Sequence, residues 1–477
     1  MNVALPALQA ELKAGVSELQ WFVEAYMLLL AALLLVGGAL GDRFGRRRVF
    51  ALGVGVFALA SLACGAAPSS AWLIAARAVQ GVGAALLVPG SLAIISAAFE
   101  GDSRGKAIGT WSGVTAIMTA FGQVLGGWLV DHLSWRAIFY LNLPLAVVTL
   151  ALLWRVPESR DPTADHPLDW TGAALATLGL GGVVFALIEA PGRGADAWVL
   201  ASGLGGVAAL VAYWLSEARS AHPMMPPALF RSPTFVGANG LTLLLYAALG
   251  GALFFVPYNL IQVQGYSATT AGAAMLPFIL EMFLLSRWAG GLIARYGARP
   301  PLVAGPAIAA LGFALLAVPG VGGPYWSTFL PGIAVLGLGM SVAVAPLTTA
   351  VMGAVSQDKA GVASGINNAV SRVGGLLAVA VFGVVILLAF SRGLEGRLTG
   401  LDLPPTVQTT ILAHRERLAE LPPPAELAPV TRAAVARAVD EAFVDGFRLA
   451  MALAAGLALA SAGVAWRWIG AEDRRAG

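Results

Sequence analysis

Two long stretches of this chain contain no charged residue, and they limit the folds open to it. Neither Ser232–Leu280 nor Pro300–Gln357 contains Asp, Glu, Lys or Arg. A helix needs about 20 mostly apolar residues to cross a membrane, so each stretch is long enough for two crossings joined by a turn. Strands of a membrane barrel would instead alternate in hydrophobicity over about ten residues, a pattern absent here. The sequence therefore predicts an all-α membrane protein.

The rest of the chain has the same character. It is 477 residues long, 58% hydrophobic and only 12% charged, whereas soluble domains carry about 25% charged residues. Apolar runs between polar breakers predict about thirteen full spans. We place these spans at 21–41, 49–67, 71–97, 107–130, 136–154, 170–189, 197–216, 234–260, 269–293, 301–320, 326–352, 361–390 and 442–468.

A repeated basic turn divides the chain. Gly38–Arg48 and Gly290–Arg299 share the order leucine, arginine, aromatic residue, glycine, each between two apolar runs. Short arginine-rich loops mark the cytoplasmic side of a membrane, so both turns are expected to face inward. Eight predicted spans separate them, and an even number is what two inward-facing turns require. The repeat predicts two related halves.

Two six-helix halves joined directly would leave only six spans between the turns. We assign the two extra spans to 170–189 and 197–216, which polar, proline-bearing segments flank. The predicted organisation is an N-terminal bundle at 1–155, a linker with two extra transmembrane helices at 156–230, and a C-terminal bundle at 231–477. Within the last part, 391–440 is expected to be an outward-facing solvated loop.

The first residues resemble the end of a helix. Only one full span precedes the first basic turn, where a six-helix half has two, and residues 1–9 read as the tail of the other. We expect the true start to lie upstream. The alternative is that the protein lacks most of this first helix.

Three further segments, together with the first basic turn, resemble motifs of a known protein family. They are Leu73–Ala85, Gly113–Leu129 and Trp135–Pro144. In this order, the four segments resemble motifs of the major facilitator superfamily, and the helix count resembles its 14-span drug:proton antiporter subfamily. The resemblance implies two six-helix bundles plus two inserted helices in a bacterial-type plasma membrane. It further implies multidrug efflux and antibiotic resistance, driven by a proton gradient with no cofactor.

The first basic turn contains an acid among its arginines. The resemblance implies that Asp42, Arg43 and Arg46 form a conformational latch, with Gly38 and Gly45 permitting the tight turn. The alternative is that these charges only set topology. In the second turn Ala294 replaces the acid, so that turn is expected to keep only the topological role.

Arg77 lies inside an otherwise apolar helix. An arginine there costs several kcal/mol unless it is paired or wet. Arg77, Gln80, Gly81 and Ala84 share one helical face, which predicts that this face lines a cavity. The resemblance implies a role for Arg77 in proton coupling. The alternative is an arginine hydrogen-bonded across helices.

The predicted fifth helix is rich in glycine. Gly109 and Gly113, and then Gly122 and Gly126 with Gly127, have the spacing that lets helices pack closely. Gln123 stands where the antiporters have proline, a departure that weakens the inference of antiport. Its side chain is expected either to face the cavity or to bond a neighbouring helix.

Two acids lie within apolar runs. Glu24 and Glu281 are candidates for exchanging protons and attracting a cationic lipophile. The alternative is that each pairs with an arginine or caps a helix. Asn367, Asn368 and Arg372 near the start of a later span are interpreted as a wet helix end. The alternative is that their side chains line the transport pathway.

Other function classes lack their signatures. No histidine cluster, acid pair or nucleophile motif predicts an enzyme, and the single Cys64 excludes disulfides and argues against a metal site. The arginines lie at helix ends and form no face for nucleic acid. We expect a monomer whose partners are a lipophilic or cationic small molecule, protons and the bilayer. A proton-coupled symporter for metabolite uptake remains an alternative, and a non-transporting membrane sensor is a weaker one.

Overall fold

The computed structural model is built of helices and turns. It describes residues 1–99, 101–160, 169–194, 196–220, 223–356, 360–401, 403–424 and 426–470, without the side chains of 101, 102, 104–106, 108, 109, 112, 113, 116, 120 and 360. No strand occurs in these ranges, which confirms the all-α prediction. Residues 161–168 of the predicted linker lie outside the described residues, and the surroundings of Gly109 and Gly113 are not described either.

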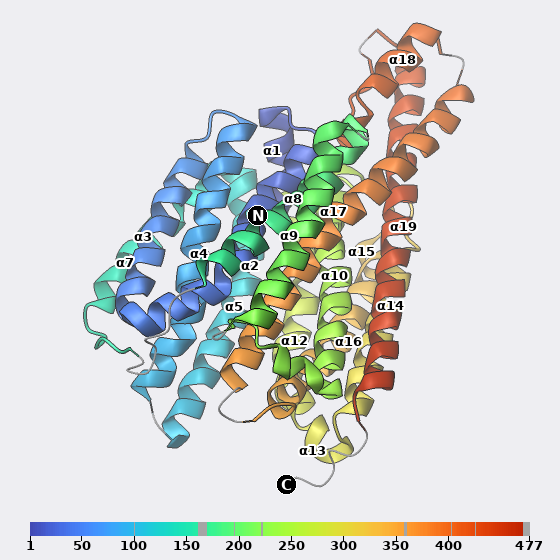
Figure 1. Ribbon diagram of the computed structural model, residues 1–477. Coiled ribbons are helices and arrows are strands. Elements are labelled where there is room, and N and C mark those ends of the chain that lie inside the picture. Colours follow the sequence, from blue (N-terminus) through green and yellow to red (C-terminus); the bar gives the residue numbers. More distant parts are fainter. Residues whose placement is uncertain are drawn as a thin grey trace.

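The helices follow one another with short connections (Figure 1). The first half and the inserted pair comprise η1 Asn2–Ala4, α1 Leu5–Leu12, α2 Val16–Phe44, α3 Arg46–Gly65, α4 Ser70–Ala98, α5 Gly101–His132, α6 Arg136–Tyr140, α7 Asn142–Leu153, α8 Trp170–Arg193 and α9 Ala197–Arg219. The second half comprises η2 Pro227–Arg231, α10 Pro233–Gln262, α11 Ala268–Ala274, α12 Leu276–Gly290, α13 Leu292–Tyr296, α14 Arg299–Leu316, α15 Tyr325–Thr328, α16 Leu330–Gly353, α17 Ala360–Thr399, α18 Pro405–Ala413, η4 Arg415–Glu420 and α19 Pro429–Trp468.

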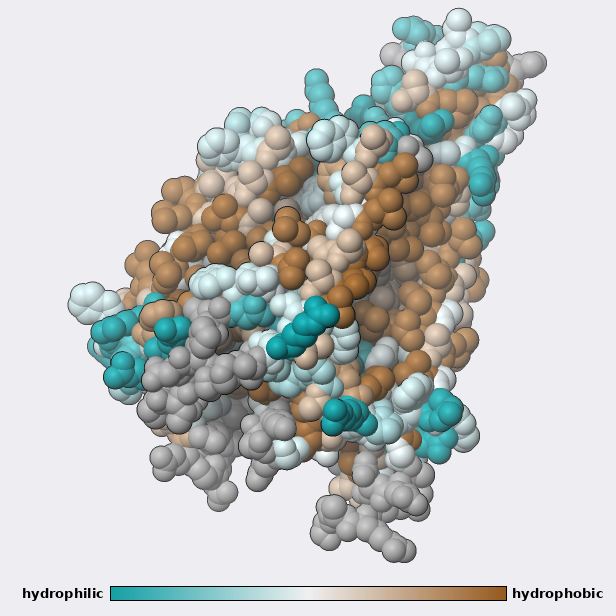
Figure 2. Space-filling view, viewed as in Figure 1, coloured by the Kyte–Doolittle hydropathy of each residue, from teal (hydrophilic) through white to brown (hydrophobic). Residues whose placement is uncertain are grey.

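These helices account for the expected spans. Among the described residues, 12 helical segments are long and apolar enough to cross a membrane, with α6–α7 and α11–α12 each counted as one. The 32-residue α5 is a further helix of spanning length. Figure 2 shows the matching surface, with a broad apolar belt between more polar ends. Between the two basic turns lie α3, α4, α5, α6–α7, α8, α9, α10 and α11–α12, in agreement with the eight spans predicted there.

Each half packs through close helix contacts. In the first half α4 packs against both α2 and α3, and in the second α10 packs against α17 and α19. The α2–α4 approach requires glycine, because a Cβ on Gly37 would lie 2.0 Å from the carbonyl oxygen of Ala85. The two halves meet along two seams, where α2 packs on α17 and α5 packs on α11.

The inserted helices cover one of these seams. α8 pairs with α9 and also packs against both α2 and α17. The Ser17 hydroxyl donates a hydrogen bond to the Ile188 carbonyl oxygen at 3.1 Å. The buried apolar residues at this junction come from all three helices: Leu28, Leu180, Val184, Ile188, Leu376 and Ala380. The inserted pair is thus part of the interface between the halves.

The expected solvated loop at 391–440 is helical instead. α17 continues to Thr399, α18 and η4 follow, and α19 begins at Pro429. Arg397 forms ion pairs with Glu441 at 3.4 Å and Asp445 at 2.6 Å. Although this segment is polar overall, it contains apolar residues that are buried in the structure: Leu394, Leu398, Leu403, Ile411, Leu418 and Val435. Figure 1 shows this extension at the end of the molecule opposite α13, and therefore opposite the second basic turn.

The α5–α11 seam depends on two glycines. A Cβ on Gly127 would lie 2.3 Å from the Ala268 carbonyl oxygen, and one on Gly272 would lie 2.4 Å from the Gln123 carbonyl oxygen. Gly126 has only an ordinary contact, and a Cβ on Gly122 would meet open space. Of the three glycines predicted to serve helix packing, the structure therefore requires only Gly127.

Gly127→Ala tests this assignment. The added methyl forces α5 from α11, and overpacking of this kind costs about 1–3 kcal/mol. We expect a lower melting temperature for the purified protein, followed by intrinsic tryptophan fluorescence. Gly122→Ala is the matched control on the same helix and should melt like the wild type. Equal melting temperatures for both variants would contradict the assignment.

Candidate functional site

The described ion pairs and hydrogen bonds of the first basic turn are made to residues of the first bundle. Arg46 pairs with Asp42 at 2.8 Å, one helical turn away. The Arg47 backbone N–H donates to the Glu158 carboxylate at 2.9 Å, and Arg48 lies 3.7 Å from the same group. Glu158 follows α7, so these contacts tie the α2–α3 turn to the end of the first bundle. The latch role remains a prediction.

The turn geometry explains its glycines. Gly45 has φ +109°, a conformation that favours glycine, and a Cβ there would lie 2.7 Å from the Glu158 carboxyl carbon. A Cβ on Gly38 would make only an ordinary contact of 3.7 Å with the Pro89 side chain. The Arg43 guanidinium lies 5.4 Å from the centre of the Phe44 ring. Gly45 is therefore the residue on which the turn's shape depends.

Arg77 lies in a buried polar cluster of the first bundle. Its side chain is 7% exposed and its Nε donates to the Phe22 carbonyl oxygen at 2.8 Å. Its Nη1 donates to the Gln80 side-chain oxygen, and the Gln80 amide in turn donates to the Ser61 hydroxyl at 2.7 Å. The alternative of hydrogen bonding across helices is thus what the structure contains. A role in proton coupling stays a prediction.

The small residues of the Arg77 face do not line a cavity, contrary to expectation. A Cβ on Gly81 would lie 2.5 Å from the Tyr26 carbonyl oxygen. Ala84 is 1% exposed and packs with Leu30 and Leu34. The face meets α2 directly, because small residues let two helices approach.

Glu24 is buried at the seam that α8 covers. The side chain is 0% exposed, and neither carboxylate oxygen has a hydrogen-bond partner among the described residues. Residues four apart share a helical face, so Gln20 and Leu28 lie on the same face of α2 as Glu24 and show what that face contacts. Gln20 donates to the Val379 carbonyl oxygen of α17 at 2.6 Å, and Leu28 packs with α8 and α17. The alternative reading, an arginine partner or a helix cap, is therefore not found for Glu24 within the described part of the chain.

Glu281 and Gln123 lie elsewhere. Glu281 on α12 is half-buried, and its Oε2 occupies the space beside Gly337 of α16. Gln123 is half-buried on α5, with its backbone carbonyl against Gly272. Within the described residues no ion pair joins Glu281 to Arg77, and Glu24 lies on α2 in the other bundle. The candidate coupling residues thus occupy separate places in the two bundles.

Asn367 is not a wet helix end. Its amide donates to the Thr242 hydroxyl at 2.7 Å and to the Asn239 side-chain oxygen at 3.2 Å. This bond joins α17 to α10 inside the second bundle. Sequence reasoning missed Asn239 and Thr242, although two polar residues one turn apart in a charge-free run are a usable signal.

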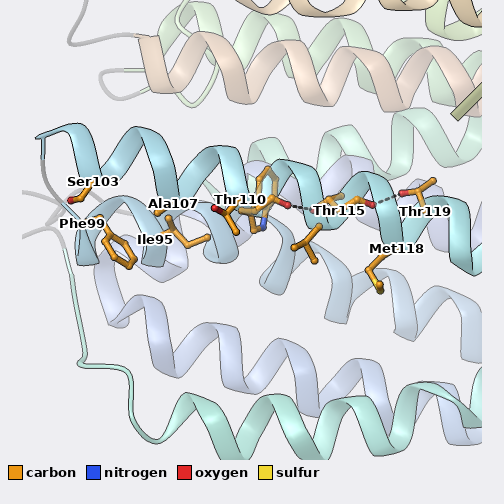
Figure 3. A pocket seen from close by; sticks show the side chains of 10 residues that line it. Ile95, Phe99, Ser103, Ala107, Thr110, Thr115, Met118 and Thr119 are labelled. Atoms are coloured by element: carbon orange, nitrogen blue, oxygen red, sulfur yellow. Dashed lines mark hydrogen bonds between the residues drawn. The ribbon is translucent and has the colours of Figure 1, made fainter. Parts of the chain in front are cut away.

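A cavity opens between the end of α4 and the beginning of α5 (Figure 3). These ends lie on the same side of the protein as the basic turns, which are expected to face the cytoplasm. Its volume is about 1000 Å³. The lining is mostly apolar with several hydroxyl groups: Ile95, Phe99, Ser103, Ala107, Thr110, Trp111, Val114, Thr115, Met118 and Thr119. Sequence reasoning did not find this stripe.

The other end of α5 is hydrogen-bonded to α11 of the second half. The Asp131 carboxylate accepts hydrogen bonds from the backbone N–H of Ala268 at 3.0 Å and of Thr269 at 2.7 Å. It also accepts from the Thr269 hydroxyl at 2.5 Å. An acid at the start of a helix is stabilised by its unpaired N–H groups. Because Asp131 belongs to α5 and its partners to α11, this bond joins the two halves on the outer side.

Comparisons with known proteins agree with the architecture. The sequence pattern of the family described as Major Facilitator Superfamily matches residues 1–379. Multidrug resistance protein Stp of Mycobacterium tuberculosis is 35% identical, over 100% of this chain and 90% of its own. The tetracenomycin C resistance and export protein of Streptomyces glaucescens is 34% identical, over 97% of this chain and 87% of its own.

A solved structure shares the fold. The inward-facing, unoccupied structure of a bacterial homolog of the human lysosomal transporter Spinster aligns with a TM-score of 0.64 at 19% identity. The alignment covers 97% of this chain and 92% of that one. At this identity the likeness concerns the fold alone.

Asp131→Ala tests the outer closure. Loss of the carboxylate leaves the first N–H groups of α11 unpaired and loosens the seam. In a Cys64→Ala background, we expect a cysteine introduced by Ala271→Cys to react several-fold faster with a membrane-impermeant maleimide. Asp196→Ala removes a similar cap at α9, where the carboxylate accepts from the Val199 N–H at 2.7 Å, and should leave the rate unchanged. An unchanged rate in Asp131→Ala would show that other contacts close the seam.

Proposed function

The chain belongs to the Major Facilitator Superfamily, and on that basis we propose that it exports drug-like or amphipathic small molecules in exchange for protons. It is a multi-pass protein of the plasma membrane. Two relatives that match nearly its whole length are named as a multidrug resistance protein and as a resistance and export protein. Those names support export as the direction.

The observation that carries the proton part is Glu24. An ionised carboxylate is costly to bury without a partner, and Glu24 is buried where the two bundles meet. A bound proton removes that cost. Opening the seam gives the carboxyl access to water, where the proton can leave. Movement of the bundles and proton exchange at Glu24 are thereby linked.

The inner cavity supports the substrate part. Its apolar walls and aromatic side chains suit an amphipathic guest, and its hydroxyls offer hydrogen bonds. Thr115 and Thr119 donate their hydroxyl hydrogens to backbone carbonyls one turn back, which leaves their oxygens as acceptors. A lipophilic or cationic molecule is the proposed substrate class, and it binds from the cytoplasm.

Alternating access follows from the two ends of α5. The outer seam is closed through Asp131 and Gly127, while the cavity lies at the inner end. Export requires the outer contacts to break after substrate has bound inside. Substrate and proton must each bind the two states differently for this exchange to be coupled. The proton gradient is the proposed driving force, without a cofactor, in a monomer.

Within this proposal the predicted coupling residues have separate tasks. Arg77 and Gln80 hold α4 against α2 beside the seam. Glu281 supplies a second carboxyl in the other bundle, and Gln123 marks the α5–α11 contact. Gln123 in place of proline also keeps proton-coupled uptake of a metabolite as the second candidate. The sign of substrate movement under an imposed gradient distinguishes the two.

Glu24→Gln tests proton coupling. Glutamine keeps the shape of the side chain but cannot carry a proton. In proteoliposomes with an imposed proton gradient, we expect gradient-driven substrate movement to be lost. Exchange of labelled for unlabelled substrate across the membrane, which needs no net proton transfer, should persist.

Glu189→Gln is the matched control. Glu189 also lies between α2 and α8, where it accepts a hydrogen bond from the Trp21 ring N–H at 3.1 Å. Its variant should keep gradient-driven movement. If Glu24→Gln transports like the wild type, the proton site lies elsewhere. Glu281→Gln asks the same of the second acid, and unchanged transport of a cationic dye would make Glu281 structural.

A further inference from the structure

Two arginines from opposite bundles lie beside the same tyrosine. The Arg77 guanidinium lies 4.4 Å from the centre of the Tyr26 ring. Arg372 on α17 interacts electrostatically with Tyr26 and Tyr246. Tyr26 lies on α2 and Tyr246 on α10, so the cluster takes one residue from each of four helices.

Helix packing fixes the position of Arg372 independently. Three residues before it, Ala369 packs against the α2–α4 cluster that includes Tyr26. One residue after it, Val373 packs against the junction of α2, α8 and α17. On the side of α10, a Cβ on Gly374 would lie 2.6 Å from the Leu243 carbonyl oxygen. Arg372 therefore lies at the level of Tyr26 on one side and of Tyr246 on the other.

The cluster contains positive charge without a carboxylate. Neither Arg77 nor Arg372 forms an ion pair with any described residue, and the buried Nε of Arg372 has no hydrogen-bond partner among them. The nearest acid along α2 is Glu24, two residues before Tyr26. Two residues span about 200° around an α-helix, so Glu24 and Tyr26 face nearly opposite directions. The acid at the seam therefore does not neutralise the arginines.

A guanidinium in an apolar bundle needs an anion or water. Arg77 has part of its need met by Phe22 and Gln80, whereas the buried Nε of the half-buried Arg372 has no partner among the residues that the structure describes. A planar guanidinium matches a carboxylate with two parallel hydrogen bonds, and phenol hydroxyls can donate to the same group. The four residues thus form a receptor for an anion between the two bundles.

We propose that Arg77 and Arg372, with the hydroxyls of Tyr26 and Tyr246, bind a carboxylate on the transported amphipathic molecule. This inference rests on the proposed export function and makes it more specific. The substrate class becomes lipophilic molecules that carry an anionic group, zwitterions included. Because the two arginines belong to different bundles, the anion bridges the halves.

Two dyes that differ only in this group provide the test. Rhodamine 110 carries a free carboxylate, and rhodamine 123 is its methyl ester. We would measure the binding of each to the purified full chain in phosphatidylcholine nanodiscs by fluorescence anisotropy. Removing one member of a buried charge pair has a large effect on affinity, so Arg372→Gln should weaken rhodamine 110 binding by at least about tenfold. Rhodamine 123 binding should change little, and Arg372→Lys should restore part of the lost affinity.

Arg287→Gln is the control. Arg287 is an exposed arginine at the end of α12, away from the cluster, and its loss should leave both dyes unaffected. Unchanged rhodamine 123 binding also reports that each variant is folded. If Arg372→Gln weakens both dyes equally, Arg372 is structural and the anion site is overturned.

Other outcomes separate the two proposals. Rhodamine 123 export by a wild type that does not bind rhodamine 110 would overturn the anion site and leave the export function standing. Absence of gradient-driven movement for both dyes and for a panel of lipophilic compounds would overturn the export function itself. Displacement of rhodamine 110 by phosphatidylglycerol added to the nanodiscs would assign the arginines to a lipid headgroup and overturn the substrate subsite.

Discussion

The packing of α2 between α4, α8 and α17 is the interaction on which the rest of the structure depends. One face of α2 meets α4 so closely that Gly37 and Gly81 are needed for the approach. Another face carries Gln20, Glu24 and Leu28 into the junction of α2 with the second bundle and the inserted helix. A single helix thus belongs to the core of one bundle and also forms part of the boundary with the other.

This arrangement keeps opposite charges apart. Glu24 lies on α2 two residues before Tyr26, the residue that Arg77 of α4 and Arg372 of α17 approach. Glu24 and Tyr26 face nearly opposite sides of α2, so the acid and the arginines do not neutralise one another. In an apolar protein such separated charges are costly to bury, and the hydrogen bonds from Arg77 to Phe22 and Gln80 compensate only part of this cost. In our proposals a proton compensates the carboxyl, and an anion compensates the arginines. In these proposals, the proton and the anion both bind beside the α2–α17 boundary, on opposite sides of α2.

The sequence was sufficient for the helices and their order but not for their partners. Apolar runs and the two basic turns predicted the spans, because membrane insertion depends on the chain's own composition. Which face meets which neighbour depends on distant residues, so Gly127 could not be distinguished from Gly122, and the stripe at Arg77 was assigned to a cavity. In the sequence Asp131 is an ordinary acid at the end of a helix. Its role becomes visible only in the structure, where it accepts a hydrogen bond from Ala268, which is far away along the chain. At 391–440 the charged residues made the sequence look like a solvated loop, although several of its leucines are buried between the ends of α17 and α19 and the short helices that connect them.

The cover that α8 provides makes the two flanks of the protein unequal. Lipid tails cannot reach the α2–α17 boundary from the side that α8 occupies, because its leucines and valines already fill that space. On the other flank, Val114 and Met118 of α5 are exposed beside the inner cavity. Among the described residues, the cavity beside α5 is therefore open to the bilayer on its flank, while the inserted helix α8 shields the α2–α17 boundary from lipid.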